Sequence, residues 1–186
     1  MRVSGGSAAA VACTLCLLAA PCGAEEPRRE GFTLEVGLGG AATTVSADGD
    51  ESETRGGLAP LSLSLGGFLS PEVALMARLG GTSFFETFGS DTIQLTNAFY
   101  GVTLQYWPID ALFLGGGFGF AVFDDNPFFG GDRVQGVTGV GLTARLGWSF
   151  VTSRHHSAAF VYELYPSFYE GATVIGNAFI LQYQML

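Results

Sequence analysis

The chain has 186 residues, of which 48% are hydrophobic and only 13% are charged, a length that suits a single domain. Ordinary soluble domains are about one quarter charged, so this chain has few groups with which to cover a solvated surface. With Lys+Arg at 8 and Asp+Glu at 17, the formal net charge is −9, which argues against a nucleic-acid-binding protein.

The first 24 residues are typical of a secretory signal peptide. Arg2 supplies a positive start, "AAAVACTLCLLAA" an apolar segment, and "PCGAEE" a small-residue end with cleavage expected after Ala24. We therefore expect residues 1–24 to be removed and residues 25–186 to form the domain. Two other interpretations stay open: a buried N-terminal helix, and a lipoprotein signal acylated at Cys22.

All three cysteines, Cys13, Cys16 and Cys22, precede the expected cleavage site. The remaining chain has no thiol, and an exported domain of this length can be stable without disulfides. It keeps seven Arg, no Lys and seventeen acidic residues, hence a formal charge of about −10. No basic patch remains for nucleic acid, and no cofactor motif is present.

Beyond Glu30, apolar and polar residues alternate in eight segments, which is the pattern of strands with two unlike faces. Clusters of Gly, Pro, Asp, Asn and Ser separate the segments. None contains the about 20 uninterrupted apolar residues of a membrane-spanning helix. Within the seventh segment, Pro166 is predicted to mark a bulge or a strand end. The predicted strands span residues 31–43, 58–68, 73–84, 92–106, 111–123, 134–150, 158–169 and 173–185.

The connections between these segments alternate in length. The longer "TVSADGDESETRGG", "FETFGSD" and "DDNPFFGGDR" follow the first, third and fifth segments, whereas the tight "LSPE" and "WPID" follow the second and fourth. Bacterial outer-membrane barrels have short periplasmic turns and longer external loops, and eight strands are their minimum. We therefore predict that both mature termini are periplasmic and that the loops at 44–57 and 124–133 form a contact surface.

Alternation alone does not say which face meets lipid, because a soluble ligand carrier has the same period with reversed polarity. Two features favour a membrane barrel. The polar set is mostly Gly, Ser, Thr and Ala, which suits a filled interior better than a solvated wall. Aromatic residues also gather near strand ends, as in the interfacial girdles of such barrels. Those expected at the membrane interface are Tyr106, Trp107, Trp148, Phe150 and Tyr183.

The same parity predicts a charged lumen. An arginine facing lipid at mid-depth costs about 2–4 kcal/mol, and a buried charge needs a partner. We therefore predict that Arg78 and Arg145 face inward and that each forms a salt bridge with Glu35 or Glu163. Further polar residues of inward parity are Asn97, Gln105 and Gln182. Met76, Phe99 and Phe113 share this parity and depart from the polar pattern.

These features resemble the small eight-stranded outer-membrane barrels, the OmpA/OmpX-like transmembrane domains. The resemblance covers everything after the leader and rests on the alternations, the unequal connections and the charged lumen. It implies an all-β, closed eight-stranded antiparallel up-and-down transmembrane β-barrel in the outer membrane of a Gram-negative cell envelope. The implied partners are outer-membrane lipid, lipopolysaccharide and the outer-membrane assembly machinery. That family commonly ends its last strand in an aromatic residue, whereas "FILQYQML" ends in Leu186.

One enzymatic alternative comes from "RHHS". The pair His155 and Ser157, with Glu163 or Glu170 downstream, resembles the His-x-Ser pair of membrane-embedded lipid A deacylases. A serine nucleophile needs a neighbouring base, and the base needs an orienting acid. The predicted topology puts the pair in a periplasmic turn, away from an outer-leaflet substrate, so ordinary turn residues are the favoured interpretation.

Two more alternatives concern ions. The acidic residues Asp48, Asp50, Glu51 and Glu53 are of the type that binds Ca²⁺, but their spacing does not match a twelve-residue calcium loop. A narrow, low-conductance pore would require the internal ion pairs to rearrange, because eight strands leave an interior filled by side chains. We therefore predict a monomeric, non-catalytic outer-membrane protein without metal or cofactor, with a structural or surface-interaction role.

Overall fold

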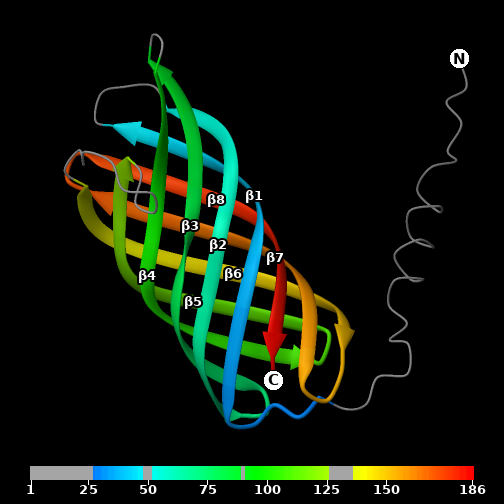
Figure 1. Cartoon of the computed structure of the whole chain (residues 1–186). Coiled ribbons are helices and arrows are strands. Elements are labelled where there is room, and N and C mark those ends of the chain that lie inside the picture. The colour runs from blue at the N-terminus through cyan, green and yellow to red at the C-terminus, as the bar shows by residue number, and fades with distance from the viewer. Residues whose placement is uncertain (1–26, 48–51, 89–90, 126–135) are drawn as a thin grey trace, which may run out of the picture.

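The computed structural model describes residues 27–47, 52–88, 91–125 and 136–186. Its strands form a closed barrel in which each strand pairs with its sequence neighbours and the first pairs with the last (Figure 1). The strands are β1 (Phe32–Ala47), β2 (Glu53–Ser70), β3 (Val73–Phe88), β4 (Asp91–Ile109), β5 (Leu112–Asp125), β6 (Val137–Thr152), β7 (His156–Tyr169) and β8 (Ala172–Met185). In the described part of the chain, no helix is long and apolar enough to span a membrane.

All pairings are antiparallel, so the predicted all-β, eight-stranded up-and-down barrel is confirmed. We call the end that carries the connections β1–β2, β3–β4, β5–β6 and β7–β8 the loop end. The opposite end, the turn end, carries the other three connections, the segment Pro27–Glu30 and the C-terminus (Figure 1). Gly171, at the β7–β8 turn, has a φ of 73°, a left-handed conformation that glycine adopts without strain.

Several strands are longer than the alternation predicts. Much of the expected loop 44–57 is strand, because β1 continues to Ala47 and β2 begins at Glu53. Cross-strand hydroxyl pairs extend the ladder there, with 2.8 Å between the Oγ1 atoms of Thr44 and Thr54. At the turn end, β4 runs to Ile109, so the "WPID" segment is mostly strand.

Pro166 is neither at a bulge nor at a strand end, so that prediction is wrong. The residue lies inside β7 and pairs with Ile175 in unbroken register. On its other side, the β6–β7 ladder has pairs at Ser167 and Leu164 but none between them. The strand therefore accommodates a residue that lacks a backbone N–H without shifting register.

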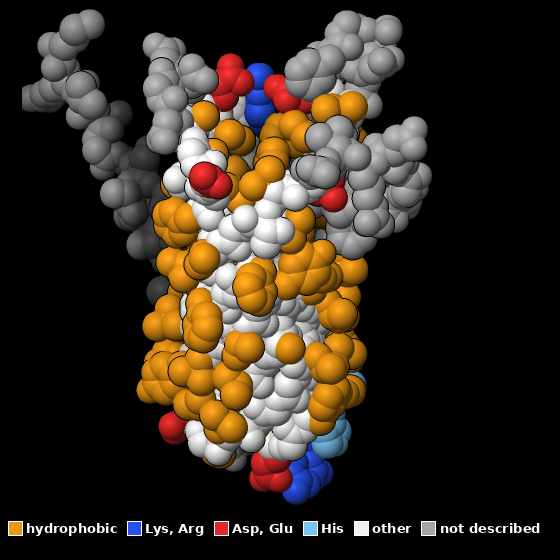
Figure 2. Space-filling view, turned by 90° about the vertical axis from the view of Figure 1, so that its left-hand side faces the viewer, with side chains coloured by type: hydrophobic (Ala, Val, Ile, Leu, Met, Phe, Trp, Pro, Cys, Tyr) orange, Lys and Arg blue, Asp and Glu red, His pale blue; other side chains and the backbone are white. Residues whose placement is uncertain are grey.

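The outer wall is apolar and the interior holds the charges. On β6, Leu142 and Leu146 are 43% and 47% exposed, whereas Arg145 between them is 3% exposed. Figure 2 shows hydrophobic side chains spread over the middle of the wall, with acidic and basic groups at its two ends. This polarity is the reverse of that of a soluble carrier, whose apolar face encloses the ligand.

Inward-facing aromatic rings occupy the space that glycines leave on nearby strands. A Cβ built on Gly147 would lie 2.0 Å from Cζ of Phe113, and one on Gly141 would lie 2.8 Å from Cδ2 of Phe99. Met76, Phe99 and Phe113 are each 1% exposed and belong to the buried core. The interior is thus packed by apolar as well as polar side chains, as expected for a narrow eight-stranded barrel.

Candidate functional site

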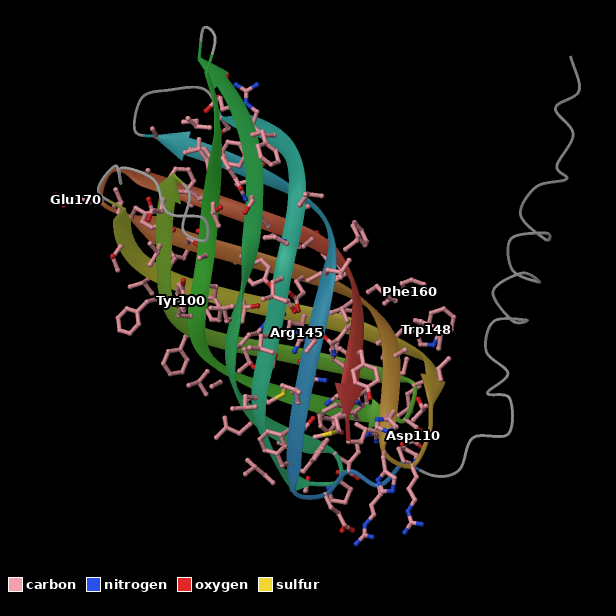
Figure 3. The ribbon with its side chains drawn as sticks, in the orientation of Figure 1. Tyr100, Asp110, Arg145, Trp148, Phe160 and Glu170 are labelled. Atoms are coloured by element: carbon pink, nitrogen blue, oxygen red, sulfur yellow. The ribbon has the colours of Figure 1, made fainter. Side chains whose placement is uncertain are left out.

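Four charged residues meet in the middle of the barrel and form what we call the central cluster: Glu35, Arg78, Arg145 and Glu163. They come from β1, β3, β6 and β7, and their side chains are 0% exposed. Alternation places each on the inward face of its strand. Arg145 lies among the strands at mid-height in Figure 3.

Both arginines contact both glutamates. Arg145 lies opposite Glu163 in the β6–β7 register, and its Nε donates to Glu163 Oε1 at 2.5 Å. Its Nη1 donates to Glu35 Oε2 at 2.9 Å. Arg78 reaches across the lumen to Glu163 Oε1, and its Nη1 lies 3.6 Å from Glu35 Oε2. The pairing that the sequence left open is therefore a shared arrangement.

Polar residues from other strands surround the central cluster. Arg145 also donates to the side-chain oxygens of Gln105, at 2.8 Å, and Gln182. Arg78 donates to the hydroxyls of Ser64, at 2.5 Å, and Ser62, at 3.0 Å. Together with the charged residues, these side chains link seven of the eight strands. Gly115 on β5 completes the ring, since a Cβ there would lie 3.4 Å from Cβ of Arg145.

Tyr165 is a member of this network that the sequence reasoning missed. Its hydroxyl donates to Glu163 Oε2 and accepts from Arg78 Nη2 at 3.3 Å. It shares the inward parity of Glu163, two residues away, and Ser62 and Ser64 show the same parity in "LSLSL". Alternation therefore contained a signal for all three residues.

The balance of charges in the central cluster favours side chains that stay in place inside the lumen. Two positive and two negative charges cancel, and removing one partner of a buried ion pair leaves a charge uncompensated at a cost of about 3–5 kcal/mol. The guanidinium carbon of Arg145 also lies 5.4 Å from the ring centroid of Phe113, within cation–π range. Arg145 and Glu163 are thus held from several directions, whereas Glu35 Oε1 and Arg78 Nε have no hydrogen-bond partner among the described residues.

Asn97, predicted to line the same space, lies apart from the central cluster. Its Oδ1 accepts from the hydroxyl of Tyr169 at 2.7 Å. The ring of Tyr169 packs edge-on against Phe123 at 6.2 Å, and Phe123 packs against Phe84 at 6.4 Å. An aromatic layer therefore lies between the central cluster and the loop end.

Trp107 corrects the predicted set of interfacial aromatics. Tyr106, Phe150 and Tyr183 are 45%, 42% and 49% exposed on the wall, and Trp148 is half-buried beside Phe160 (Figure 3). Trp107, by contrast, is 3% exposed and points into the barrel. Neighbouring residues of a strand face opposite sides, so Tyr106 and Trp107 cannot both face lipid.

The segment Pro27–Glu30 crosses the turn end of the barrel. Arg29 is 7% exposed, pairs with Asp110 Oδ1 at 2.9 Å and places its guanidinium carbon 5.1 Å from the Trp107 ring. Burial lowers the pKa of the Arg29 guanidinium, while its hydrogen bond to Asp110 acts in the opposite direction. Between the central cluster and the turn end, the lumen therefore contains the rings of Phe113 and Trp107 and the guanidinium of Arg29, packed on one another.

The structure does not assemble the serine–histidine–acid arrangement. Ser157 is buried, and its hydroxyl donates to Ser149 Oγ at 3.1 Å. His156 Nδ1 lies 2.6 Å from the hydroxyl of Tyr183, and the His155 ring packs edge-on against that of His156. Glu163 is engaged by two arginines, and Glu170 lies at the loop end, far from the turn that carries the histidines (Figure 3). The geometry offers no support for a nucleophilic serine.

The acidic segment considered for Ca²⁺ is described only in part. Asp48, Asp50 and Glu51 lie outside the described residues. Glu53 pairs with Arg55 at 2.6 Å, and Arg55 also lies 3.3 Å from Glu86. The described part of this hairpin thus uses its carboxylate in an ion pair on the barrel surface.

The fold is shared with solved outer-membrane proteins, although no protein-family model and no curated protein sequence matches the chain. Ail, the attachment invasion locus protein of Yersinia pestis, crystallised with the heparin analogue sucrose octasulfate, aligns with a TM-score of 0.55 at 14% identity, over 83% of this chain and 99% of Ail. Neisserial surface protein A aligns with a TM-score of 0.60 at 13% identity, over 83% of this chain and 96% of its own. The chain therefore has the fold of the small eight-stranded outer-membrane β-barrels.

Proposed function

We propose that this chain is an integral protein of the bacterial outer membrane with a structural or surface-interaction role and no catalytic activity. In this proposal, residues 1–24 are a leader that is removed on export, and the turn end faces the periplasm. The loop end, with the segments 44–57 and 124–133, faces outward and carries the contacts with partners.

The observation that carries the proposal is the apolar wall. Large hydrophobic side chains are exposed on all eight strands, including Leu65 at 48%, Phe118 at 70% and Phe179 at 70%. Soluble monomers rarely expose contiguous apolar patches of more than a few hundred Å². A closed barrel also satisfies its backbone hydrogen bonds internally, as a structure surrounded by hydrocarbon must.

The filled interior favours a structural role over transport. The central cluster links strands across the lumen, aromatic rings pack above it, and Trp107 and Phe113 pack below it. Passage of a solute through this path would require buried ion pairs to separate. The loop end is then the part of the protein available for recognition.

The charge of the residues at the loop end indicates which class of partner this end can bind. Ail crystallised with a sulfated heparin analogue, but this chain has few cations with which to bind one. The ends of the strands and the connections there carry the arginines Arg55 and Arg133 against the acids Asp48, Asp50, Glu51, Glu53, Glu86, Asp91, Asp124, Asp125, Asp132 and Glu170. We therefore expect repulsion of sulfated polysaccharides and attraction of cationic surfaces.

Protease treatment of intact cells tests the proposal. Cleavage within 44–57, with protection of the β2–β3 turn at residues 69–72, is the expected pattern. Cleavage at 69–72 on intact cells would reverse the proposed orientation. Recovery of the protein in the soluble periplasmic fraction would refute membrane insertion itself. A matched experiment on permeabilised cells controls for intrinsic resistance of the turn to the protease.

A further inference from the structure

A group of basic side chains lies at one side of the turn end. We call it the cationic rim after its two arginines, Arg28 and Arg154; it also contains His155 and His156, and all four residues are exposed. Two distant segments form it, because the main-chain N–H of Arg28 donates to the carbonyl of Arg154 at 3.1 Å. The segment before β1 therefore brings its arginine to the β6–β7 turn.

An aromatic part of the wall adjoins the cationic rim. Phe150 and Phe160 stack there at 4.7 Å and are 42% and 58% exposed. His156 stacks on Tyr183 at 5.7 Å, and its Nδ1 lies 2.6 Å from the tyrosine hydroxyl. Figure 2 shows histidine and arginine side chains gathered along the lower edge of the hydrophobic wall.

The register sets the order of these groups along the barrel. Phe160 lies opposite Leu181, and nearer the turn end Ala158 lies opposite Tyr183 and His156 opposite Met185. Moving toward the turn end, the wall thus passes from apolar side chains to amphipathic rings and then to the residues of the cationic rim. A phospholipid next to a barrel places its acyl chains, glycerol and phosphate at these same successive depths.

Charge at the cationic rim is only partly compensated. Arg28 pairs with Glu30 at 2.9 Å, and that glutamate remains 62% exposed. Arg154 has no carboxylate within 4.0 Å among the residues that the structure describes. Elsewhere on the surface, Arg55 contacts two carboxylates.

We propose that the cationic rim binds the phosphate of an anionic phospholipid whose acyl chains lie against Phe150 and Phe160. The inference rests on the proposed membrane insertion and adds a specific lipid site to it. Guanidinium groups bind phosphate oxygens through charge-assisted hydrogen bonds. Arg154 supplies the uncommitted guanidinium, Arg28 adds a second, and the tyrosine and histidine rings fit the level of the headgroup.

The test uses the full mature chain folded into bilayers of dimyristoylphosphatidylcholine and dimyristoylphosphatidylglycerol in equal amounts. Native mass spectrometry of the released protein then measures which lipid stays bound. The wild type is expected to retain phosphatidylglycerol preferentially. Each arginine near a membrane surface strengthens binding of anionic lipid about fivefold, so the Arg28→Gln/Arg154→Gln variant should lose the preference by about tenfold or more.

The matched control removes two arginines from the loop-end region, Arg55→Gln/Arg133→Gln, and should keep the preference. Arg154→Gln alone, whose side chain has no ion pair to lose among the described residues, provides a second test with little risk to folding. A wild type without preference, or a preference that survives both rim variants, would overturn the lipid site. Failure to insert into pure phosphatidylcholine bilayers would instead contradict the membrane proposal, so the two failures are distinguishable.

Discussion

Replacing Glu163 with glutamine should destabilise the barrel strongly while keeping its shape. Glu163 Oε1 accepts from both arginines of the central cluster, and its Oε2 accepts from Tyr165. An amide of the same size retains one acceptor oxygen but removes the negative charge. Arg78 and Arg145 are then left with Glu35 as the sole carboxylate of the cluster, and the interior gains one uncompensated positive charge.

The expected loss follows from the complete burial of the group. Breaking a buried ion pair by removing one partner costs about 3–5 kcal/mol, whereas a whole domain is stable by about 5–15 kcal/mol. With a urea dependence of about 1–3 kcal/mol per M, the unfolding midpoint should fall by at least about 1 M. Tryptophan fluorescence in phosphatidylcholine vesicles follows this transition.

Glu53→Gln provides the matched control, because it removes the same charge from an exposed pair whose side chains are 45% and 66% accessible. Exposed pairs contribute about 0–1 kcal/mol, so this midpoint should barely move. The double variant Glu163→Gln/Arg78→Gln removes both charges of one buried pair and should recover part of the loss. Equal midpoints for Glu163→Gln and Glu53→Gln would refute the reasoning, because the central cluster would then contribute no more than a surface pair.

Three further predictions concern packing, parity and catalysis. Gly147→Leu should prevent assembly of the barrel, because a Cβ there already lies 2.0 Å from the Phe113 ring. Adding Phe113→Ala to the Gly147→Leu variant should partly restore the heat-modifiable migration on gels that marks a folded barrel. No restoration in the double variant would contradict the assigned contact. Lipids brominated on their acyl chains should quench the fluorescence of Trp148, measured in a Trp107→Phe variant. They should leave the fluorescence of Trp107, measured in a Trp148→Phe variant, largely unquenched. The opposite result would reverse the assigned faces. Ser157→Ala should leave the lipid A acylation pattern of cells unchanged, and an altered pattern in mass spectra would reinstate the enzymatic alternative.

The alternating pattern was sufficient to predict the strands and the sides that their residues face. Turn residues between the alternating segments, such as Pro71 between β2 and β3, lie close to strand ends, whereas Pro166 lies inside β7. Arg145 could be placed inside from its neighbours Leu142 and Leu146, because side chains two apart on a strand share a face. Trp107 shows what happens when that rule is set aside, since grouping it with Tyr106 by aromatic character gave the wrong side of the wall.

Strand ends were less predictable, because backbone pairing can continue where side-chain polarity no longer alternates. The outer part of the β1–β2 hairpin is polar on both faces, yet Thr44 and Thr54 keep it paired through their hydroxyls. Pro166 was also misjudged, because a residue without a backbone N–H interrupts a strand only where the neighbouring strand would accept a hydrogen bond from it.

Local sequence thus determined the number of strands, their alternation and the enclosure of the charges, all of which depend on residues a few positions apart. Only the closed tertiary structure decided that Arg78 and Arg145 share the same two glutamates, since those contacts depend on the registers of separate strands and on the width of the lumen. The same holds for Arg28 beside Arg154, two residues that the sequence separates widely and that meet only because the barrel closes.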